Sequence, residues 1–421
     1  MRFFYTSLFY LLVPFILLRL LWRSIKAPAY RERWRERFAL YHQKFPCNVI
    51  WFHAVSVGES EALFPLLRHI QKQYPDTRLL VTTTTPTGSA RVRAMMQDSV
   101  IHVYLPYDMP DTINRFIRCF KPKVAVIMET EIWPNLFTGC AANAVPLYLI
   151  NARLSEKSAR GYQKISSLVH PTLSHVSIIA AQTEEDAQRF ISIGAKADKV
   201  KIFGNIKFDI NVSADIIGDG TRLRQTLFSK RFVWVIASTH KDEEALFLDI
   251  YKDIKVRIPE LLMLVVPRHP ERFTEVKRLC EQQQLKVVTR TTGVAVSDEV
   301  DIYLVDTMGE LKTMYAASDV AFVGGSMVPT GGHNILEASA VGIPVLFGPY
   351  MDNFKEIAKG VLKQQAAIQC QNKAAVVKAI LTLYQQPTER LGLVENGKRF
   401  LKQNQGAIAR IFAMLEPIIR T

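Results

Sequence analysis

The sequence predicts an α/β protein with two doubly wound, Rossmann-like domains. From Asn48 onward, short apolar runs alternate with amphipathic segments, which indicates right-handed βαβ units and mostly parallel sheets. The alternation forms two series, separated by the segment Gly204–Arg224, which we interpret as an interdomain linker. With 421 residues, of which 48% are hydrophobic, the chain can supply two domain cores. Ligands of such sheets bind beyond the carboxyl ends of the strands, so the polar residues found there are the candidate site.

Seven strands are predicted in the first series and six in the second. The first series comprises Val49–His53, Leu79–Thr83, Val100–Tyr104, Val124–Met128, Leu147–Ile150, Ser177–Ala181 and Lys201–Phe203. The second series comprises Val233–Ala237, Leu261–Val266, Lys286–Thr289, Ile302–Val305, Val320–Val323 and Val345–Phe347. Helices are expected between the strands, for example over Glu59–Gln73 and Pro110–Phe120, and the tail Lys373–Ile419 is expected to be helical throughout.

The N-terminal stretch Phe3–Trp22 is the most apolar in the chain and has about the length that crosses a bilayer core of about 30 Å. A basic cluster overlaps its end and follows it: Arg19, Arg23, Lys26, Arg31, Arg33, Arg35, Arg37 and Lys44. A signal peptide has most of its charge before the apolar core and a small-residue cleavage site after it, which does not fit here. We expect an uncleaved anchor over residues 1–25, spanning once or lying in the interface, with the rest of the protein on the cytoplasmic side. A buried core helix is the alternative.

Charge and cysteine content narrow the class of protein. The formal charge of +14 suits nucleic acid, anionic lipid or a polyanionic substrate. Because the charge concentrates beside the apolar stretch and no nucleic-acid motif is present, we expect anionic membrane lipids as partners and no nucleic acid. A basic binding module without enzymatic activity is the alternative class. Five scattered cysteines without a C-x-x-C pair fit a reducing compartment and argue against a zinc site.

The stretch Phe322–Pro349 predicts a nucleotide site. It reads as strand, glycine-rich turn, helix and strand, and its glycine pairs allow backbone N–H groups to approach a phosphate. The helix is expected to begin near Asn334. Glu337 would then lie one turn inside it and accept hydrogen bonds from a ribose diol. The alternative is an ordinary βαβ turn with a solvated glutamate.

Acidic residues follow two strands of the first domain. Glu59 opens a helix just after the first strand, either as a helix-capping residue or as a general base. Glu129 and Glu131 follow the fourth strand beside a tryptophan, a poor composition for a generic turn, and Arg153 after the next strand offers a cationic partner. Lys207, at the predicted linker, is placed to reach a phosphate or carboxylate.

Hydroxyl and basic residues follow other strands. The threonine-rich run Thr82–Ser89 could bind anionic or sugar groups or merely cap a helix. In the second domain Arg268 follows a strand and could clamp a phosphate with two hydrogen bonds. The chain has no D-x-D motif, no G-x-x-x-x-G-K-[ST] motif and no histidines at metal-ligand spacing, so we expect no metal and no P-loop.

Seven motifs together resemble those of the bacterial 3-deoxy-D-manno-octulosonic acid (Kdo) transferases of lipopolysaccharide biosynthesis. They are HAVSVGESEA (His53–Ala62), TTTTPTGSARV (Thr82–Val92), METEIWPN (Met128–Asn135), NARLSEKS (Asn151–Ser158), FGNIKFD (Phe203–Asp209), VPRHPERF (Val266–Phe273) and GGSMVPTGGHNILEASAVGIPVLFGPYMDNF (Gly324–Phe354). The N-terminal apolar segment and its basic cluster are also similar to those of the family, so the resemblance covers essentially the whole chain.

The resemblance implies a GT-B fold, in which two Rossmann-like domains face a cleft. It implies an anchor over residues 1–25, an acceptor-binding domain over 26–208, a CMP-Kdo-binding domain over 209–400 and a C-terminal helix over 401–421 that packs back on the first domain. The implied reaction moves Kdo from CMP-Kdo to the lipid A precursor (lipid IVA) with inversion, without metal or cofactor, at the inner membrane. A different GT-B enzyme, such as a UDP-sugar transferase or a sugar-nucleotide epimerase, is the alternative.

The resemblance also assigns roles to residues at matching positions. Glu59 matches the general base, and Glu129 and Lys207 match residues that stabilise the transition state. The donor-binding positions are Pro267, Arg268, Met308, Gly309, Glu310, Asn334, Ile335, Leu336 and Glu337. Flanking positions that we include in the candidate site are Ser56, Gly58, Thr87, Gly88, Glu131, Ser238, Thr239, Gly325 and Ser326.

Overall fold

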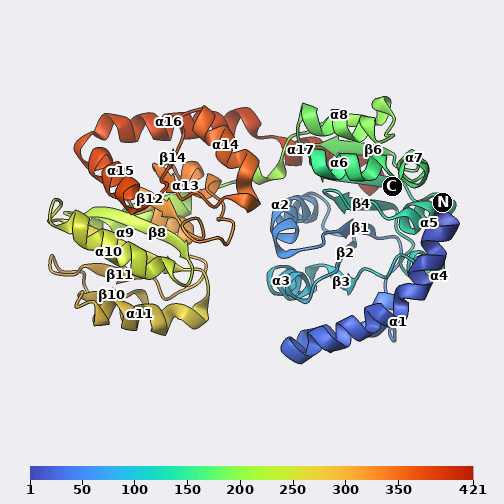
Figure 1. Cartoon of the computed structure of the whole chain (residues 1–421), viewed down its shortest axis with the longest axis horizontal. Coiled ribbons are helices and arrows are strands. Elements are labelled where there is room, and N and C mark those ends of the chain that lie inside the picture. Colours follow the sequence, from blue (N-terminus) through green and yellow to red (C-terminus); the bar gives the residue numbers. More distant parts are fainter. Residues whose placement is uncertain (421) are drawn as a thin grey trace. The chain divides into compact units, whose positions relative to one another are not determined.

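The computed structural model describes residues 1–420 and divides into two compact units, each built on its own parallel sheet (Figure 1). Unit 1 comprises Met1–Asp209 and Gln405–Thr421, and unit 2 comprises Ile210–Asn404. Both sheets have seven strands, and all thirteen predicted strands are present with ends displaced by at most two residues. The predicted class, α/β with two Rossmann-like domains, is therefore confirmed.

The sheet of unit 1 has the order β3-β2-β1-β4-β5-β6-β7, and every neighbouring pair is parallel. The strands are β1 Ile50–His53, β2 Leu79–Thr83, β3 Ile101–Tyr104, β4 Val124–Met128, β5 Leu147–Ala152, β6 Ile178–Ala181 and β7 Val200–Ile202. Every residue of β1, β2 and β4 is buried, because helices cover both faces of the sheet. The strand order reverses between β1 and β4, which is where such sheets bind ligands.

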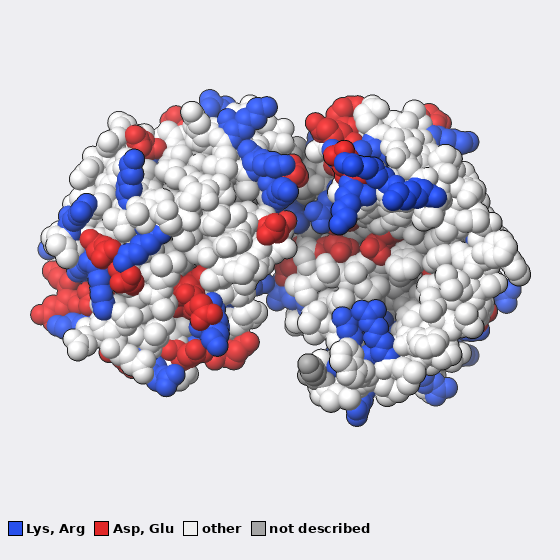
Figure 2. Space-filling view, viewed as in Figure 1, with Lys and Arg blue, Asp and Glu red and all other residues white. Residues whose placement is uncertain are grey.

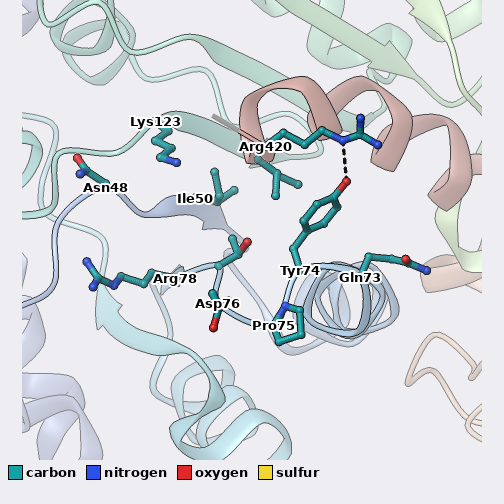
Figure 3. A pocket seen from close by; sticks show the side chains of 11 residues that line it. Asn48, Ile50, Gln73, Tyr74, Pro75, Asp76, Arg78, Lys123 and Arg420 are labelled. Atoms are coloured by element: carbon teal, nitrogen blue, oxygen red, sulfur yellow. Dashed lines mark hydrogen bonds between the residues drawn. The ribbon is translucent and has the colours of Figure 1, made fainter.

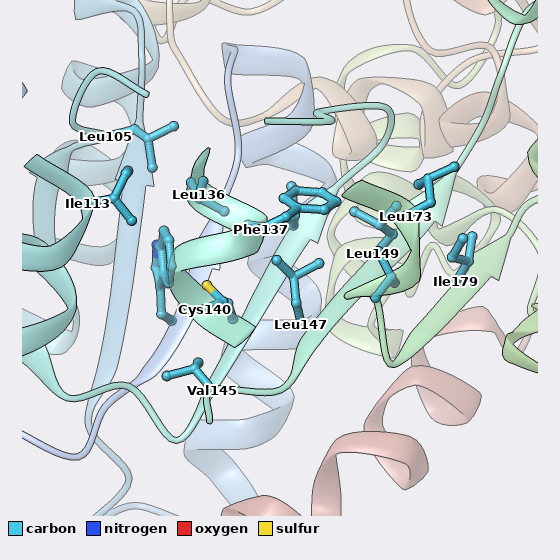
Figure 4. Close-up of a cluster of buried hydrophobic side chains, with 14 of the residues drawn as sticks. Leu105, Ile113, Leu136, Phe137, Cys140, Val145, Leu147, Leu149, Leu173 and Ile179 are labelled. Carbon is cyan, nitrogen blue, oxygen red and sulfur yellow. The ribbon is translucent and has the colours of Figure 1, made fainter. Parts of the chain in front are cut away.

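Helices pack on both faces of this sheet. They are α2 Val57–Gln73, α3 Pro86–Met96, α4 Pro110–Phe120, α5 Pro134–Ala142, α6 Glu156–Gln163, α7 Ser166–Ser174, α8 Glu184–Ser192 and α17 Ala407–Arg420. Figure 4 shows the core on one face, where Leu136 and Phe137 of α5 lie over Leu147 and Leu149 of β5. Residues of α2 and α17 close the core on the other face.

Helix α17 joins unit 1 although it ends the chain. Ala407, Ile411, Leu415 and Ile419 recur every four residues and are buried among the apolar residues of α2 and the sheet. The carboxylate of Asp209 accepts the N–H groups of Gly406 and Ile408, each at 2.5 Å, and so caps the start of the helix.

The sheet of unit 2 has the order β10-β11-β9-β8-β12-β13-β14 and is also entirely parallel. The strands are β8 Phe232–Thr239, β9 Leu261–Pro267, β10 Val287–Thr289, β11 Ile302–Leu304, β12 Val320–Val323, β13 Val345–Phe347 and β14 Ile368–Gln369. The prediction missed β14, which is only two residues long. Here the order reverses between β8 and β12.

The helices of unit 2 are α9 Ala214–Leu227, α10 Glu243–Lys255, α11 Phe273–Gln282, α12 Leu311–Ala316, α13 Leu336–Val341, α14 Lys355–Lys363, α15 Lys373–Gln385 and α16 Pro387–Asn404. The predicted linker Gly204–Arg224 contains the boundary between the units, after Asp209, but its second half is helical because α9 begins behind the cap Ser213. A Cβ atom on Gly220 would lie 2.3 Å from the Cβ of Ala316, so this glycine allows α9 and α12 to pack closely. The tail is helical over nearly all of its length, as predicted, and consists of the three helices α15, α16 and α17.

Helix α1 Arg2–Lys26 lies on unit 1 and keeps most of its apolar residues exposed. Its segment Arg2–Ile25 is long and apolar enough to cross a membrane. On the side that faces unit 1, the hydroxyl of Tyr5 donates to Asp108 at 2.9 Å, and that of Tyr10 donates to Asp111 at 2.5 Å. Its polar residues therefore bind the domain, while Phe3, Phe4, Leu8, Leu11 and Phe15 are exposed.

Candidate functional site

The candidate residues of unit 1 lie beyond the carboxyl ends of β1, β4 and β5, around the position where the strand order reverses. Glu59 stands in the first turn of α2 just after β1, and Glu129 follows β4 directly. Figure 2 shows acidic side chains at the bottom of a hollow on this face of unit 1, with basic side chains around it. The structure thus brings together residues that lie far apart in the sequence.

Glu59 is held by the loop that leads into α2. Its carboxylate accepts the N–H of Val55 at 2.8 Å and the hydroxyl of Ser56 at 3.0 Å, while its own N–H donates to Ser56 at 3.5 Å. This is a capping box, so the helix-capping interpretation describes the geometry correctly. Burial raises the pKa of Glu59 to about 7; the charges of Glu129 and Glu131 also raise it, against the two accepted hydrogen bonds. A carboxylate with that pKa is half-ionised near neutral pH, as a general base requires.

Glu129 has a backbone that side chains other than glycine rarely adopt. Its φ of 57° is in the left-handed region, and its N–H donates to the carbonyl of Ile150 at 3.0 Å. Its side chain is only 13% exposed and accepts a hydrogen bond from Nε of Arg153 at 2.8 Å. Arg153 is therefore the cationic partner that the sequence suggested. Glu131 accepts the indole N–H of Trp133 at 2.8 Å, and burial raises its pKa.

Lys207 lies on a short 3-10 turn, η5 Ile206–Phe208, that is fastened to β5. Oδ1 of Asn151 accepts the N–H of Ile206 at 3.1 Å, and Oδ1 of Asn205 accepts the N–H of Lys207 at 2.9 Å. Burial lowers the pKa of Lys207, while the charges of Glu129 and Glu59 oppose this change. The ammonium group thus belongs to the same electrostatic cluster as the two carboxylates.

The threonine-rich loop contacts the loop that holds Glu59 through the hydroxyl of Thr85. Oγ1 of Thr85 accepts the N–H of Gly88 at 3.1 Å and donates to the carbonyl of Val55 at 3.2 Å. Thr85 thereby caps α3 and ties it to the loop that holds Glu59. Thr87 and Gly58 are exposed.

The glycine-rich loop of unit 2 is organised by Glu243, which the sequence analysis did not select. This carboxylate is fully buried at the start of α10 and accepts the N–H groups of Gly325 at 2.6 Å, Ser326 at 3.0 Å, Met327 at 2.9 Å and His240 at 3.2 Å. The amides of Gly325 and Ser326 therefore face a carboxylate of the chain itself, in contrast to the expectation that they are open to a phosphate. Burial raises the pKa of Glu243, opposed by these four hydrogen bonds.

The helix after the glycine-rich loop begins at Leu336, two residues later than predicted. Ile335 and Leu336 are fully buried, so their side chains belong to the core, and only their backbone can contact a ligand. Oδ1 of Asn334 accepts the N–H of Leu336 at 3.1 Å. Glu337 is the second helical residue rather than one turn inside, and its charge adds to the burial that raises the pKa of Tyr315.

The other donor-binding candidates lie on loops of the same edge. Arg268 is exposed just after Pro267, the last residue of β9, and its N–H donates to the carbonyl of Thr239 at 3.1 Å. Glu310 pairs with Arg290 at 2.9 Å, and this partner lowers its pKa. Met308 is 56% exposed, and the φ of Gly309 is 89°.

Ser238 and Thr239 end β8 beside these loops. Ser238 is buried with a φ of 57°, and the hydroxyl of Thr239 donates to Glu244 at 3.0 Å. The left-handed backbone of Ser238 coincides with an irregularity in the pairing of β8 with β9. The side chain of Thr239 is thus used within unit 2, and the backbone of Ser238 shapes the strand end.

A separate hollow lies at the opposite edge of the unit 1 sheet (Figure 3). It is lined by residues that precede β1, β2 and β4, among them Asn48, Arg78 and Lys123, and by Arg420 of α17. Arg420 donates to the hydroxyl of Tyr74 at 2.8 Å there. Because these residues flank the amino ends of the strands, this hollow is not part of the candidate site.

Comparisons with known proteins match both units. A family model described as 3-deoxy-D-manno-octulosonic-acid transferase (kdotransferase) matches residues 32–210, and one described as glycosyl transferases group 1 matches residues 245–400. A 3-deoxy-D-manno-octulosonic acid transferase of Haemophilus influenzae is 39% identical, with 99% of each chain covered. One of Bordetella pertussis is 32% identical over 87% of this chain and 86% of its own.

A solved structure has the same fold at much lower sequence identity. It is the UDP-GlcNAc 2-epimerase of Neisseria meningitidis bound to UDP-GlcNAc, which is 13% identical and has a TM-score of 0.57. The match covers 89% of this chain and all of that one. It supports the GT-B architecture that was expected from the sequence.

Proposed function

The chain belongs to the 3-deoxy-D-manno-octulosonic acid transferase family of lipopolysaccharide biosynthesis, and we propose that it moves Kdo from CMP-Kdo to the lipid A precursor lipid IVA with Glu59 as the general base. The observation that carries this proposal is the cluster beyond β1 and β4. It combines a carboxylate whose pKa is about 7 with a second carboxylate and a half-buried lysine.

In the proposed reaction Glu59 takes the proton of an acceptor hydroxyl, whose oxygen attacks the anomeric carbon of Kdo. The bond from that carbon to the phosphate oxygen breaks, and CMP leaves with the electron pair. Attack from the side opposite the phosphate inverts the anomeric centre. Glu129 would stabilise positive charge that develops on the sugar, and Lys207 negative charge on the phosphate. Because CMP has one phosphate, no metal ion that bridges two phosphates is required.

We assign the donor to unit 2. The loops beyond β9, β11 and β12 supply Arg268, the segment Met308–Glu310 and the segment Asn334–Glu337. Since the side chains of Ile335 and Leu336 are buried, their part in nucleotide binding would be through the backbone. Thermal-shift measurements with CMP and UMP test which nucleobase the protein binds. Stabilisation by UMP alone would favour a UDP-sugar enzyme of the same fold.

We place the protein on the cytoplasmic face of the inner membrane, held by α1 and by the basic residues that follow it. The lipid acceptor and anionic lipids would then be available at the same surface. The long apolar segment Arg2–Ile25 and its exposed side chains support this location. Nucleic acid is not expected to bind.

Substitution of Glu59 tests the proposed base. Glu59→Gln keeps the shape of the side chain but cannot accept a proton, so transfer should fall by about 10²–10⁴-fold while CMP still binds. The assay incubates purified protein with CMP-Kdo and lipid IVA and identifies the products by mass, which also counts the transferred Kdo units. Glu61→Gln is the matched control, because Glu61 is on the same helix but pairs with Arg91 at the surface. Full turnover by Glu59→Gln would remove Glu59 from the role of base.

A further inference from the structure

Three histidines gather at the carboxyl edge of the unit 2 sheet, beside the glycine-rich loop. His240 follows β8, His269 follows β9, and His333 lies between β12 and α13. The Nε2 atoms of His240 and His333 are 2.8 Å apart, and their rings are nearly parallel, with 7° between the planes. The ring of His269 packs edge-on against His240, with centroids 5.5 Å apart. The three residues are on separate loops, so their spacing in the sequence did not predict contact between the rings.

The backbone fixes the positions of the two paired histidines. The N–H of His240 donates to the buried carboxylate of Glu243, which also holds the amide of Gly325. A Cβ atom on Gly325 would lie 3.0 Å from the ring of His333, so the glycine leaves room for that ring. The contact between the two rings is therefore built into the same network that shapes the glycine-rich loop.

Positive charges act on the pair: those of Arg268 and Arg272, and that of His269 when this ring is protonated. Arg268 and His269 act on both rings, and Arg272 acts on His240. The carboxylates nearby already have partners, because Glu244 binds Arg272 at 3.0 Å and Glu243 accepts four backbone N–H groups. Arg268 is exposed and has no ion-pair partner within residues 1–420.

The pair is uncharged at neutral pH. Burial, together with the positive neighbours, lowers the pKa of His333 to about 3 and also lowers the pKa of His240. An Nε2-to-Nε2 distance of 2.8 Å requires one hydrogen between the two atoms, since two lone pairs or two N–H groups would repel each other. If a second proton arrives, both nitrogens become donors, and an anion between them relieves the repulsion.

We infer that the His240–His333 pair, together with Arg268, binds one oxyanion of the donor and takes up a proton from the solvent as it does so. The oxyanion is the phosphate of the nucleotide or the carboxylate of the sugar acid. The proton goes to the Nε2 atom that lacks one, and both Nε2–H groups then donate to the anion, in charge-assisted hydrogen bonds. This inference rests on the proposed donor and adds a proton-linked anion subsite to it.

Calorimetry with the full-length protein tests the inference. Heats of CMP binding are measured near pH 8, where the phosphate of CMP is fully ionised, in HEPES and in Tris, whose protonation enthalpies differ. The wild-type protein should take up a proton with CMP but not with cytidine, if the phosphate is the anion. If the carboxylate is the anion, uptake appears only with intact CMP-Kdo. In either case His333→Asn and His240→Asn should abolish the uptake and weaken binding roughly tenfold.

His42→Asn, at an exposed position of unit 1, is the control and should leave uptake unchanged. Thermal unfolding of each variant shows whether unit 2 is intact, and the two separate substitutions guard against the failure of one to fold. Binding of the donor by the wild-type protein without proton uptake, or uptake that persists in both variants, would overturn the inference. Failure of the wild-type protein to bind any cytidine nucleotide would instead contradict the proposed donor.

Discussion

The carboxylate of Glu59 accepts hydrogen bonds from two donors, and the charges of two other acidic residues act on it. The donors favour its ionised form, whereas burial and the charges of Glu129 and Glu131 favour its protonated form. Burial and the two acidic neighbours prevail, so the carboxyl group of Glu59 titrates near neutral pH. A capping box thus positions a carboxylate that its surroundings make basic enough to accept a proton.

The dependence of kcat/KM on pH should reflect the pKa of Glu59 and should shift when a neighbouring charge is removed. The base must be ionised to act, so kcat/KM should fall as pH decreases through about 7, the pKa of Glu59. In Glu129→Gln one negative neighbour is lost, the pKa of Glu59 falls, and the acid limb of the profile should move to lower pH. The measurement is kcat/KM against pH for both proteins, and only the midpoint is compared, because Glu129 also affects the rate. An unchanged midpoint would show that another group controls the limb.

At the residue scale, sequence reasoning found the groups that immediately follow a strand. Glu59, Glu129 and Arg153 could be predicted because each follows a strand by a few residues. Glu243 could not, because its partners are the amides of residues 325–327 on a loop 82 to 84 positions away. Its role depends on the adjacency of β8 and β12, which is a property of the folded sheet.

At the element scale, the hydrogen bonds of α1 indicate how this apolar helix lies relative to a membrane. A helix that spans a membrane has its first residues on the far side, yet Tyr5 and Tyr10 donate to Asp108 and Asp111 of unit 1. At the other end of α1, Arg31 of the following turn donates to Ser24 at 2.8 Å. We therefore expect α1 to lie in the interface with its apolar face in the lipid.

Substitution of the exposed apolar residues of α1 tests this expectation. Each of Phe4, Leu8 and Leu11 should contribute up to about 1.5–3 kcal/mol when buried in lipid, so the triple change to Ser should weaken vesicle binding by more than about 100-fold. Flotation with anionic vesicles measures the binding. Leu391→Ser is the control, because Leu391 is 62% exposed on α16 of unit 2. Alkaline carbonate should release the wild-type protein from membranes, whereas resistance to release would indicate a spanning helix.

The segment 204–224 shows why element boundaries were harder to predict than strands. Its three glycines and several polar residues are typical of a linker, but Gly218 and Gly220 are inside α9. Gly220 is there because α12 approaches closely, and that approach is not visible in the local sequence. Strands such as β4 and β12 were predicted with their ends correct, because buried β-branched runs are a local signal.

At the scale of the whole molecule, unit 1 is built from two stretches that are not continuous in the sequence. Unit 1 takes its last helix from the end of the sequence, so unit 2 is inserted between Asp209 and Gln405. Asp209 directly precedes unit 2, and its carboxylate caps α17, which begins soon after unit 2 ends. The stability of unit 1 should therefore depend on residues that follow unit 2.

Substitutions in α17 should destabilise unit 1 and spare unit 2. Ile411 and Leu415 are fully buried in the core formed with α2, so each change to Ala should lower the free energy of unfolding of unit 1 by about 2–5 kcal/mol. Two units with separate cores are expected to unfold in separable steps, which urea titration with CMP present or absent can assign, since CMP should raise only the midpoint of unit 2. Ala413→Ser, on the exposed side of the same helix, should change neither step. A loss of stability in the CMP-sensitive step would mean that α17 supports unit 2 instead.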